Sequence, residues 1–119
     1  MENKIITKKQ KNGIKIIQQL LNEMHKDIKE LMEFERIETS AEKIKDKSIR
    51  IAKIAIALQE SLDIKNGGEV AKNLEHLYKH VRFAVARVMD DNDFTYLNSA
   101  EKVTSEINKG WAKISTAAA

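Results

Sequence analysis

The chain has 119 residues, of which 33% are charged, with a formal net charge of +3, four glycines and neither cysteine nor proline. This length predicts a single domain over residues 1–119 with a core that needs no cross-links. The lack of cysteine excludes disulfides, thiolate zinc sites and thiol nucleophiles, and a composition rich in Ala, Ile, Leu, Lys and Glu favours long helices over sheets.

Residues 1–12 are expected to form a short, flexible basic arm. Its lysines and the one that follows it are opposed by a single acidic residue: Lys4, Lys8, Lys9, Lys11 and Lys15. Such an arm can bind nucleic acid or an acidic membrane surface, but it contains no aromatic residue to stack on bases. We therefore expect a solvated terminus and no nucleic-acid partner.

No signal peptide is visible, and no apolar run approaches the roughly 20 residues that span a bilayer. The sequence therefore predicts a cytoplasmic protein without membrane insertion.

Two helices are predicted in the first half of the chain. The first covers about residues 13–37, with Asn12 as N-cap, because apolar residues recur every three or four positions. They are Ile14, Ile17, Leu21, Met24, Ile28 and Leu31. Thr39 and Glu42 have the spacing of a capping box, which predicts a second helix over about 40–64. Its main apolar stripe is Ile44, Ile51, Ala55, Leu58 and Leu62, with Ser48 in the gap.

The second helix carries more apolar surface than one stripe. From Ile49 to Leu58 it is apolar nearly all round, interrupted only by Arg50 and Lys53. One core-facing stripe of roughly 100° is enough for a helix in a simple bundle. The surplus needs a second partner surface: the N-terminal arm, another subunit or a target helix.

A turn and two further helices follow. Asp63, Asn66, Gly67 and Gly68 are expected to form the turn, because glycine adopts the left-handed conformation that ends helices. The third helix covers about 69–90, and its core seam is Val70, Leu74, Leu77, Val81, Ala84 and Val88. A second row contains Ala71, Tyr78 and Val85. With Asp93 as N-cap, a fourth helix covers about 94–115. These elements predict an all-α, antiparallel up-down four-helix bundle.

Catalytic and metal-binding patterns are weak. His76 and His80 share a helix face, but no Glu lies between them in the zinc-protease manner, and both are expected to face solvent. The loop from Asp90 lacks the glycine and oxygen ligands of a calcium loop, since Phe94 and Thr95 occupy those positions. We therefore expect no cofactor, no metal and no enzymatic activity. A binding bundle and a thicker core or homodimer remain as alternatives.

The turn region resembles the flagellar secretion chaperone family FliS. Members of this family are similar to the pattern SLD-x-x-x-GGEIA-x-NL-x-x-LY at the same junction. Here it reads Ser61-Leu62-Asp63, Gly67-Gly68-Glu69-Val70-Ala71, Asn73-Leu74 and Leu77-Tyr78. The likeness continues through Asn92-Asp93 to Trp111-Ala112-Lys113-Ile114, whereas the N-terminal half departs from the family pattern. Met24 and His25, for example, stand where the family has Tyr and Asp.

The resemblance implies a non-enzymatic chaperone of type III secretion in bacterial flagellum biogenesis. Its expected partner is the disordered C-terminal segment of flagellin, held in apolar grooves until delivery to the export gate. Binding would prevent premature polymerisation. A FliS-fold co-chaperone or a dimeric interaction protein with another partner is the alternative. From the apolar rows left after each core stripe is assigned, we expect the groove to contain Ile49, Ala52, Ile56, Ala71, Tyr78 and Val85.

Overall fold

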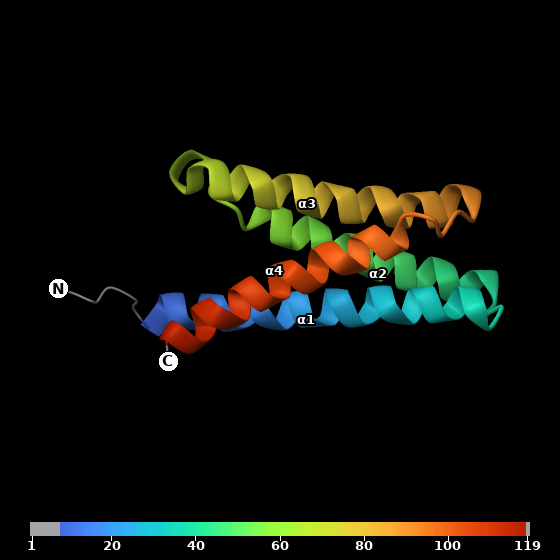
Figure 1. The fold of residues 1–119 in the computed structure, drawn as a ribbon, viewed down its shortest axis with the longest axis horizontal. Helices are drawn as coiled ribbons and strands as arrows, with labels where there is room; N and C mark the ends of the chain where they lie inside the picture. Colours follow the sequence, from blue (N-terminus) through green and yellow to red (C-terminus); the bar gives the residue numbers. More distant parts are fainter. Residues whose placement is uncertain (1–7, 119) are drawn as a thin grey trace.

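The computed structural model describes residues 8–118, and within them all side chains except those of 8–12, 14 and 112–118. Four helices follow one another: α1 (Lys8–Arg36), α2 (Ala41–Glu60), α3 (Ile64–Asp91) and α4 (Leu97–Ala118). Successive helices run in opposite directions, so the all-α up-down bundle is confirmed (Figure 1). Part of the expected N-terminal arm, residues 1–7, lies outside the described residues.

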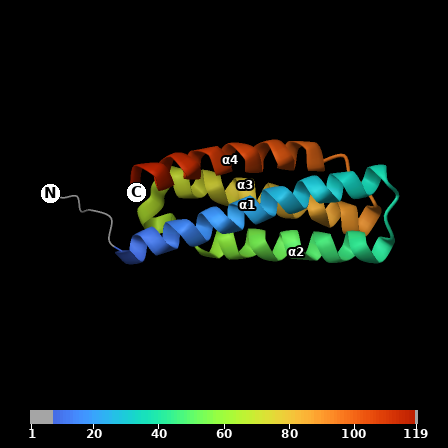
Figure 2. The same cartoon turned by 90° about the horizontal axis from the view of Figure 1, so that it is seen from below.

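Each helix packs against two others around one core. α1 contacts α2 and α4, and α3 contacts the same two helices from the opposite side. The view from below shows α1 between α2 and α4, with α3 behind it (Figure 2). Because every helix has two neighbours, its buried face is wider than a single row of side chains.

The expected core faces of the first two helices are buried. In α1, Leu21, Met24, Ile28 and Leu31 are fully buried, and Ile17 packs against them; the side chain of Ile14 lies outside the described set. In α2 the core residues are Ile51, Ile54, Ala55 and Leu58. The buried Ser48 hydroxyl donates to the Ile44 carbonyl at 2.7 Å, so its polar atom is satisfied inside the core.

The two apolar rows of α3 do not separate into core and groove. Tyr78 and Val85 of the second row are buried, as are Val81 and Val88 of the core seam. Val70, at the start of the core seam, is 69% exposed. Burial raises the pKa of Tyr78 to about 12. Since α2 and α4 flank α3 on two sides, both rows are covered in its C-terminal half.

The connection between α1 and α2 differs from the predicted capping box. Glu38 adopts a φ of +52°, and the Thr39 N–H donates to the Phe34 carbonyl at 3.1 Å. This left-handed closure of α1 uses Thr39, so the N-cap of α2 falls one residue later. Ser40 is that cap, and its side chain accepts the Lys43 N–H. At its other end, α1 begins at Lys8, which places Asn12 inside the helix instead of at its start.

The four expected turn residues lie between α2 and the long part of α3. α2 ends at Glu60, and Asp63 caps a single helical turn through its side chain, which accepts the Asn66 N–H at 3.1 Å. The Asn66 side-chain amide donates to the same carboxylate at 2.7 Å, and both bonds hold the pKa of Asp63 below its usual range. Gly68 then breaks the helix with a φ of +57°. The second helix is therefore shorter than predicted, and the turn longer.

The connection from α3 to α4 is also longer than expected. Asn92 closes α3 with a φ of +54°. Asp93, predicted as the N-cap of the last helix, instead accepts the Thr95 N–H at 2.9 Å in a turn that precedes α4 by one residue. Arg87 reaches this turn, 3.2 Å from Asp93 and 2.8 Å from Asp91. The acidic loop thus serves to end one helix and lead into the next.

Candidate apolar groove between α2 and α3

An apolar groove of about 410 Å³ runs along the outer face of α2 and α3. α2 contributes Ala52 and Ile56, which lie one turn apart. α3 contributes a row of residues along one side of the helix. That row consists of Lys79, Arg82, Phe83, Ala86 and Met89.

Three large apolar side chains in this groove are open to solvent. Phe83 is 48% exposed, Met89 37% and Ile56 36%. Scattered exposed apolar residues are common on protein surfaces, but here they share one depression between two packed helices. The groove therefore offers a pre-formed apolar strip to which another chain can add buried area.

The structure brings together only part of the expected groove. Ala52 and Ile56 line it, and Ile49 is half-buried on the same helix without lining it. Ala71, Tyr78 and Val85 are instead buried, the last two within the main core cluster, so they present almost no surface to a partner in this structure.

Sequence reasoning missed the α3 side of the groove. Phe83, Ala86 and Met89 belong to neither apolar row of that helix, and each is next to a charged residue in the sequence. The available signal was that Phe83 and Met89 are large apolar residues outside both rows. Phe83 and Met89 could not face the bundle core together with the two rows, because they lie on another side of the helix.

Polar and aromatic groups border the groove. Arg82 donates to the Gln59 side-chain oxygen at 2.9 Å, which ties α3 to α2 across one end. The ring of Phe83 packs edge-on against Tyr96, with centroids 4.9 Å apart. His80, next to this pair, is 2.8 Å from the Ser99 hydroxyl on α4. Lys79 and Arg82 make this side of the groove basic.

The two histidines of α3 do not form a metal-binding cluster within the described residues. His76 is exposed, and His80 has Ser99 as its partner, so the two imidazoles do not converge with a third ligand. Across residues 8–118, no group of three or more His, Asp or Glu side chains is placed to hold a metal ion. Within the same span, no helix combines the length and apolar character needed to cross a bilayer.

The fold and the groove define a four-helix bundle that leaves an apolar helix–helix groove open. The sequence matches the family described as flagellar protein FliS over residues 2–118, and the chain belongs to that family.

Two curated relatives have related names. The chain is 35% identical over 77 residues to flagellar secretion chaperone FliSB of Pseudomonas aeruginosa, covering 62% of this chain and 61% of that protein. It is 31% identical over 61 residues to flagellar secretion chaperone FliS of Vibrio cholerae, covering 51% of this chain and 45% of that protein. The chain therefore spans less than two thirds of the length of these relatives. No solved structure matches it significantly.

Proposed function

We propose that the protein is a cytoplasmic export chaperone that binds the disordered C-terminal segment of flagellin through the α2/α3 groove. Bound in this way, the segment cannot polymerise prematurely and is kept ready for the flagellar type III export apparatus. The observation that supports this most strongly is the open apolar groove of Ala52, Ile56, Phe83, Ala86 and Met89 in a chain of the FliS family. The names of the two relatives point the same way.

The groove has the physical properties that such a partner requires. A disordered segment loses conformational entropy when it becomes ordered, so its binding site must offer apolar area in compensation. An amphipathic helix laid between α2 and α3 would cover Ile56, Phe83 and Met89 together. The basic side chains Lys79 and Arg82 then lie where acidic residues on the partner's polar face could reach them.

The test is a binding titration with a peptide of the flagellin C-terminal segment and two matched variants. Ile56→Glu places a charge in the groove. Ala57→Glu places the same charge on the neighbouring, exposed residue of α2, which does not line the groove. Because both substituted positions are exposed, both variants are expected to retain the helical content and melting temperature of the wild type.

We expect Ile56→Glu to weaken binding by at least about tenfold, since a charge must be desolvated against an apolar partner. Ala57→Glu should bind as the wild type does. Equal affinity for all three proteins would remove the groove from the proposal. No binding by the wild type at micromolar concentration, together with concentration-dependent dimerisation, would favour the co-chaperone or dimer alternative.

A further inference from the structure

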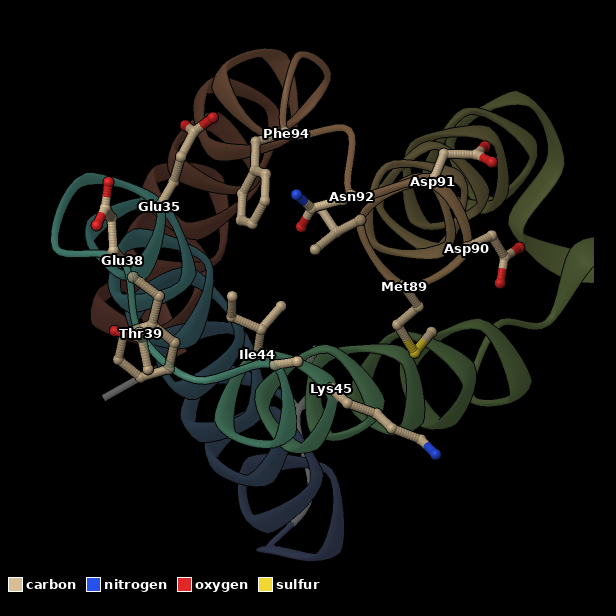
Figure 3. A pocket seen from close by; sticks show the side chains of 13 residues that line it. Glu35, Glu38, Thr39, Ile44, Lys45, Met89, Asp90, Asp91, Asn92 and Phe94 are labelled. Carbon is tan, nitrogen blue, oxygen red and sulfur yellow. The ribbon is translucent and has the colours of Figure 1, made fainter.

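A second and larger hollow lies at the end of the bundle where α1 passes into α2 and α3 passes into α4. Figure 3 shows the side chains that line it. Its volume is about 1030 Å³. It lies beyond the α2/α3 groove and shares Met89 with it, so the two depressions adjoin. We call it the end cavity.

The floor of the end cavity is apolar. Phe34, Ile44, Val88 and Phe94 line it, one from each of the segments that meet at this end. Figure 3 shows the side chains of Phe94 and Ile44 directed into the hollow and that of Met89 lying between α3 and α2. Phe34, Ile44 and Phe94 are only half-buried, so the four-helix core does not use their whole apolar surface.

The rim of the end cavity is acidic. Its charged residues are Glu35, Glu38, Asp90 and Asp91, against Lys45 alone. The acidic side chains point outward around the rim (Figure 3). They would therefore attract a ligand through their electric field, without contacting the floor. Of these four, Asp91 is paired with Arg87 at 2.8 Å. The local excess of acidic residues is opposite in sign to the net charge of the chain, which is +3.

We propose that the end cavity docks a basic segment of a protein partner, with an apolar side chain on the floor and Lys or Arg residues at the rim. The apolar floor requires an apolar anchor, and the rim selects cations around it. Phe34, Ile44 and Phe94 keep part of their apolar surface exposed, which suits an extended or helical segment better than an enclosed small molecule. The charge is opposite to that of the groove, where Lys79 and Arg82 favour acidic residues. The end cavity is thus a separate site with its own specificity, beyond the flagellin binding proposed above.

The probe is a synthetic amphipathic peptide of about 14 residues, long enough to form a helix on binding, built only from Leu and Lys. Two control peptides have the same pattern: Leu with Glu, and Ser with Lys. Binding is followed by chemical-shift changes in the amides of the isotopically labelled protein. The Leu/Lys peptide should perturb residues 34–45 and 88–94, and neither control should do so.

Two pairs of charge reversals complete the test. Glu35→Lys with Asp90→Lys reverses the rim. Both sites lie in the last turn of a helix, where a cation interacts favourably with the helix dipole, so the fold should be retained. Glu60→Lys with Glu106→Lys makes the same change of net charge at exposed positions that do not line the cavity. We expect the rim pair to lower the affinity for the Leu/Lys peptide by about tenfold and the control pair to have little effect on it.

Three results would overturn the inference: equal binding of the Leu/Lys and Leu/Glu peptides, shift changes confined to the groove around Ile56 and Phe83, or equal losses in the two charge-reversal proteins. If the Ser/Lys peptide bound as tightly as the Leu/Lys peptide, binding would depend on charge alone, and this result would also overturn the inference. Each of these results leaves the flagellin titration unaffected, so the two proposals fail independently.

Discussion

At the scale of single residues, the two adjacent glycines of the turn have different roles. Gly67 lies in a helical turn, but a Cβ built on it would come within 2.6 Å of the Ala71 Cβ. Gly68 has open space around it, yet its φ of +57° lies in a region that side chains with a Cβ rarely adopt. One position therefore needs glycine for close approach, and the other for its backbone conformation.

This difference predicts different responses to alanine. Gly67→Ala and Gly68→Ala should each destabilise the protein by roughly 1–3 kcal/mol, the first by overpacking and the second by backbone strain. Adding Ala71→Gly should recover part of the loss in Gly67→Ala, because it removes the clashing atom, and should recover none in Gly68→Ala. The free energies come from urea unfolding followed by circular dichroism. Equal recovery in both backgrounds would contradict this assignment.

At the scale of helices, the sequence predicted which segments are helical but not where they end. The apolar period of three and four residues located the first three helices, because burial selects that pattern over many positions. The ends depend on single hydrogen bonds. A left-handed Glu38 moved the cap of α2 from Thr39 to Ser40, and the turn at Asp93 moved the start of α4 to Leu97. No period in the sequence reports on such local choices.

The end of α1 provides a test at this scale. Glu38 carries a side chain at a φ of +52°, where glycine is preferred. Glu38→Gly should therefore raise the free energy of unfolding by about 1 kcal/mol. This value is the strain of the left-handed conformation that glycine relieves, minus the extra conformational entropy that glycine loses on folding.

The matched control is Glu35→Gly, which removes a carboxylate from the same rim but lies within the helix. It should lower stability by about 1 kcal/mol. Thermal unfolding at neutral pH compares the two proteins, and a stability change of the same sign in both would show that charge, not backbone conformation, dominates.

At the scale of the whole molecule, polar contacts fix the position of α1 on α2. Asp27 is only 3% exposed, and it accepts hydrogen bonds from Arg50 at 2.7 Å and from Lys47 at 3.4 Å. The same two cations reach Glu23 and Glu30, each at 2.8 Å. A buried carboxylate with two partners on the neighbouring helix sets the register between the two helices, which apolar packing alone leaves loosely defined.

Removing this carboxylate should weaken the bundle. Asp27→Ala is expected to lower the free energy of unfolding by about 2 kcal/mol, since it removes charge-assisted hydrogen bonds. Asp46→Ala, on the exposed side of α2, should change it by less than about 0.5 kcal/mol. Chemical denaturation provides both values. If the two substitutions had equal effects, the α1–α2 contacts would contribute nothing specific.

The division between core and groove was the part that the sequence could not settle. Periodicity shows that Tyr78 and Ile56 belong to apolar faces, but not which neighbouring helix covers each face. That depends on how α4 lies across α1 and α3, a property of the assembled bundle. Consequently the α2 side of the groove was predicted in part, through Ala52 and Ile56, while Phe83 and Met89 stood out in the sequence as apolar residues outside both rows but could be placed beside α2 only in the folded bundle.

An even number of antiparallel helices brings the start of α1 and the finish of α4 to the same end of the bundle, opposite the end cavity (Figure 1). The molecule is 55 Å long, so this separation is nearly its full length. A tag, dye or surface linkage attached through either terminal helix therefore leaves the α1–α2 and α3–α4 connections facing away from the attachment. Immobilised in this orientation, the protein would present the acidic rim of the end cavity to a partner in solution, which suits surface-based measurements of the docking proposed above.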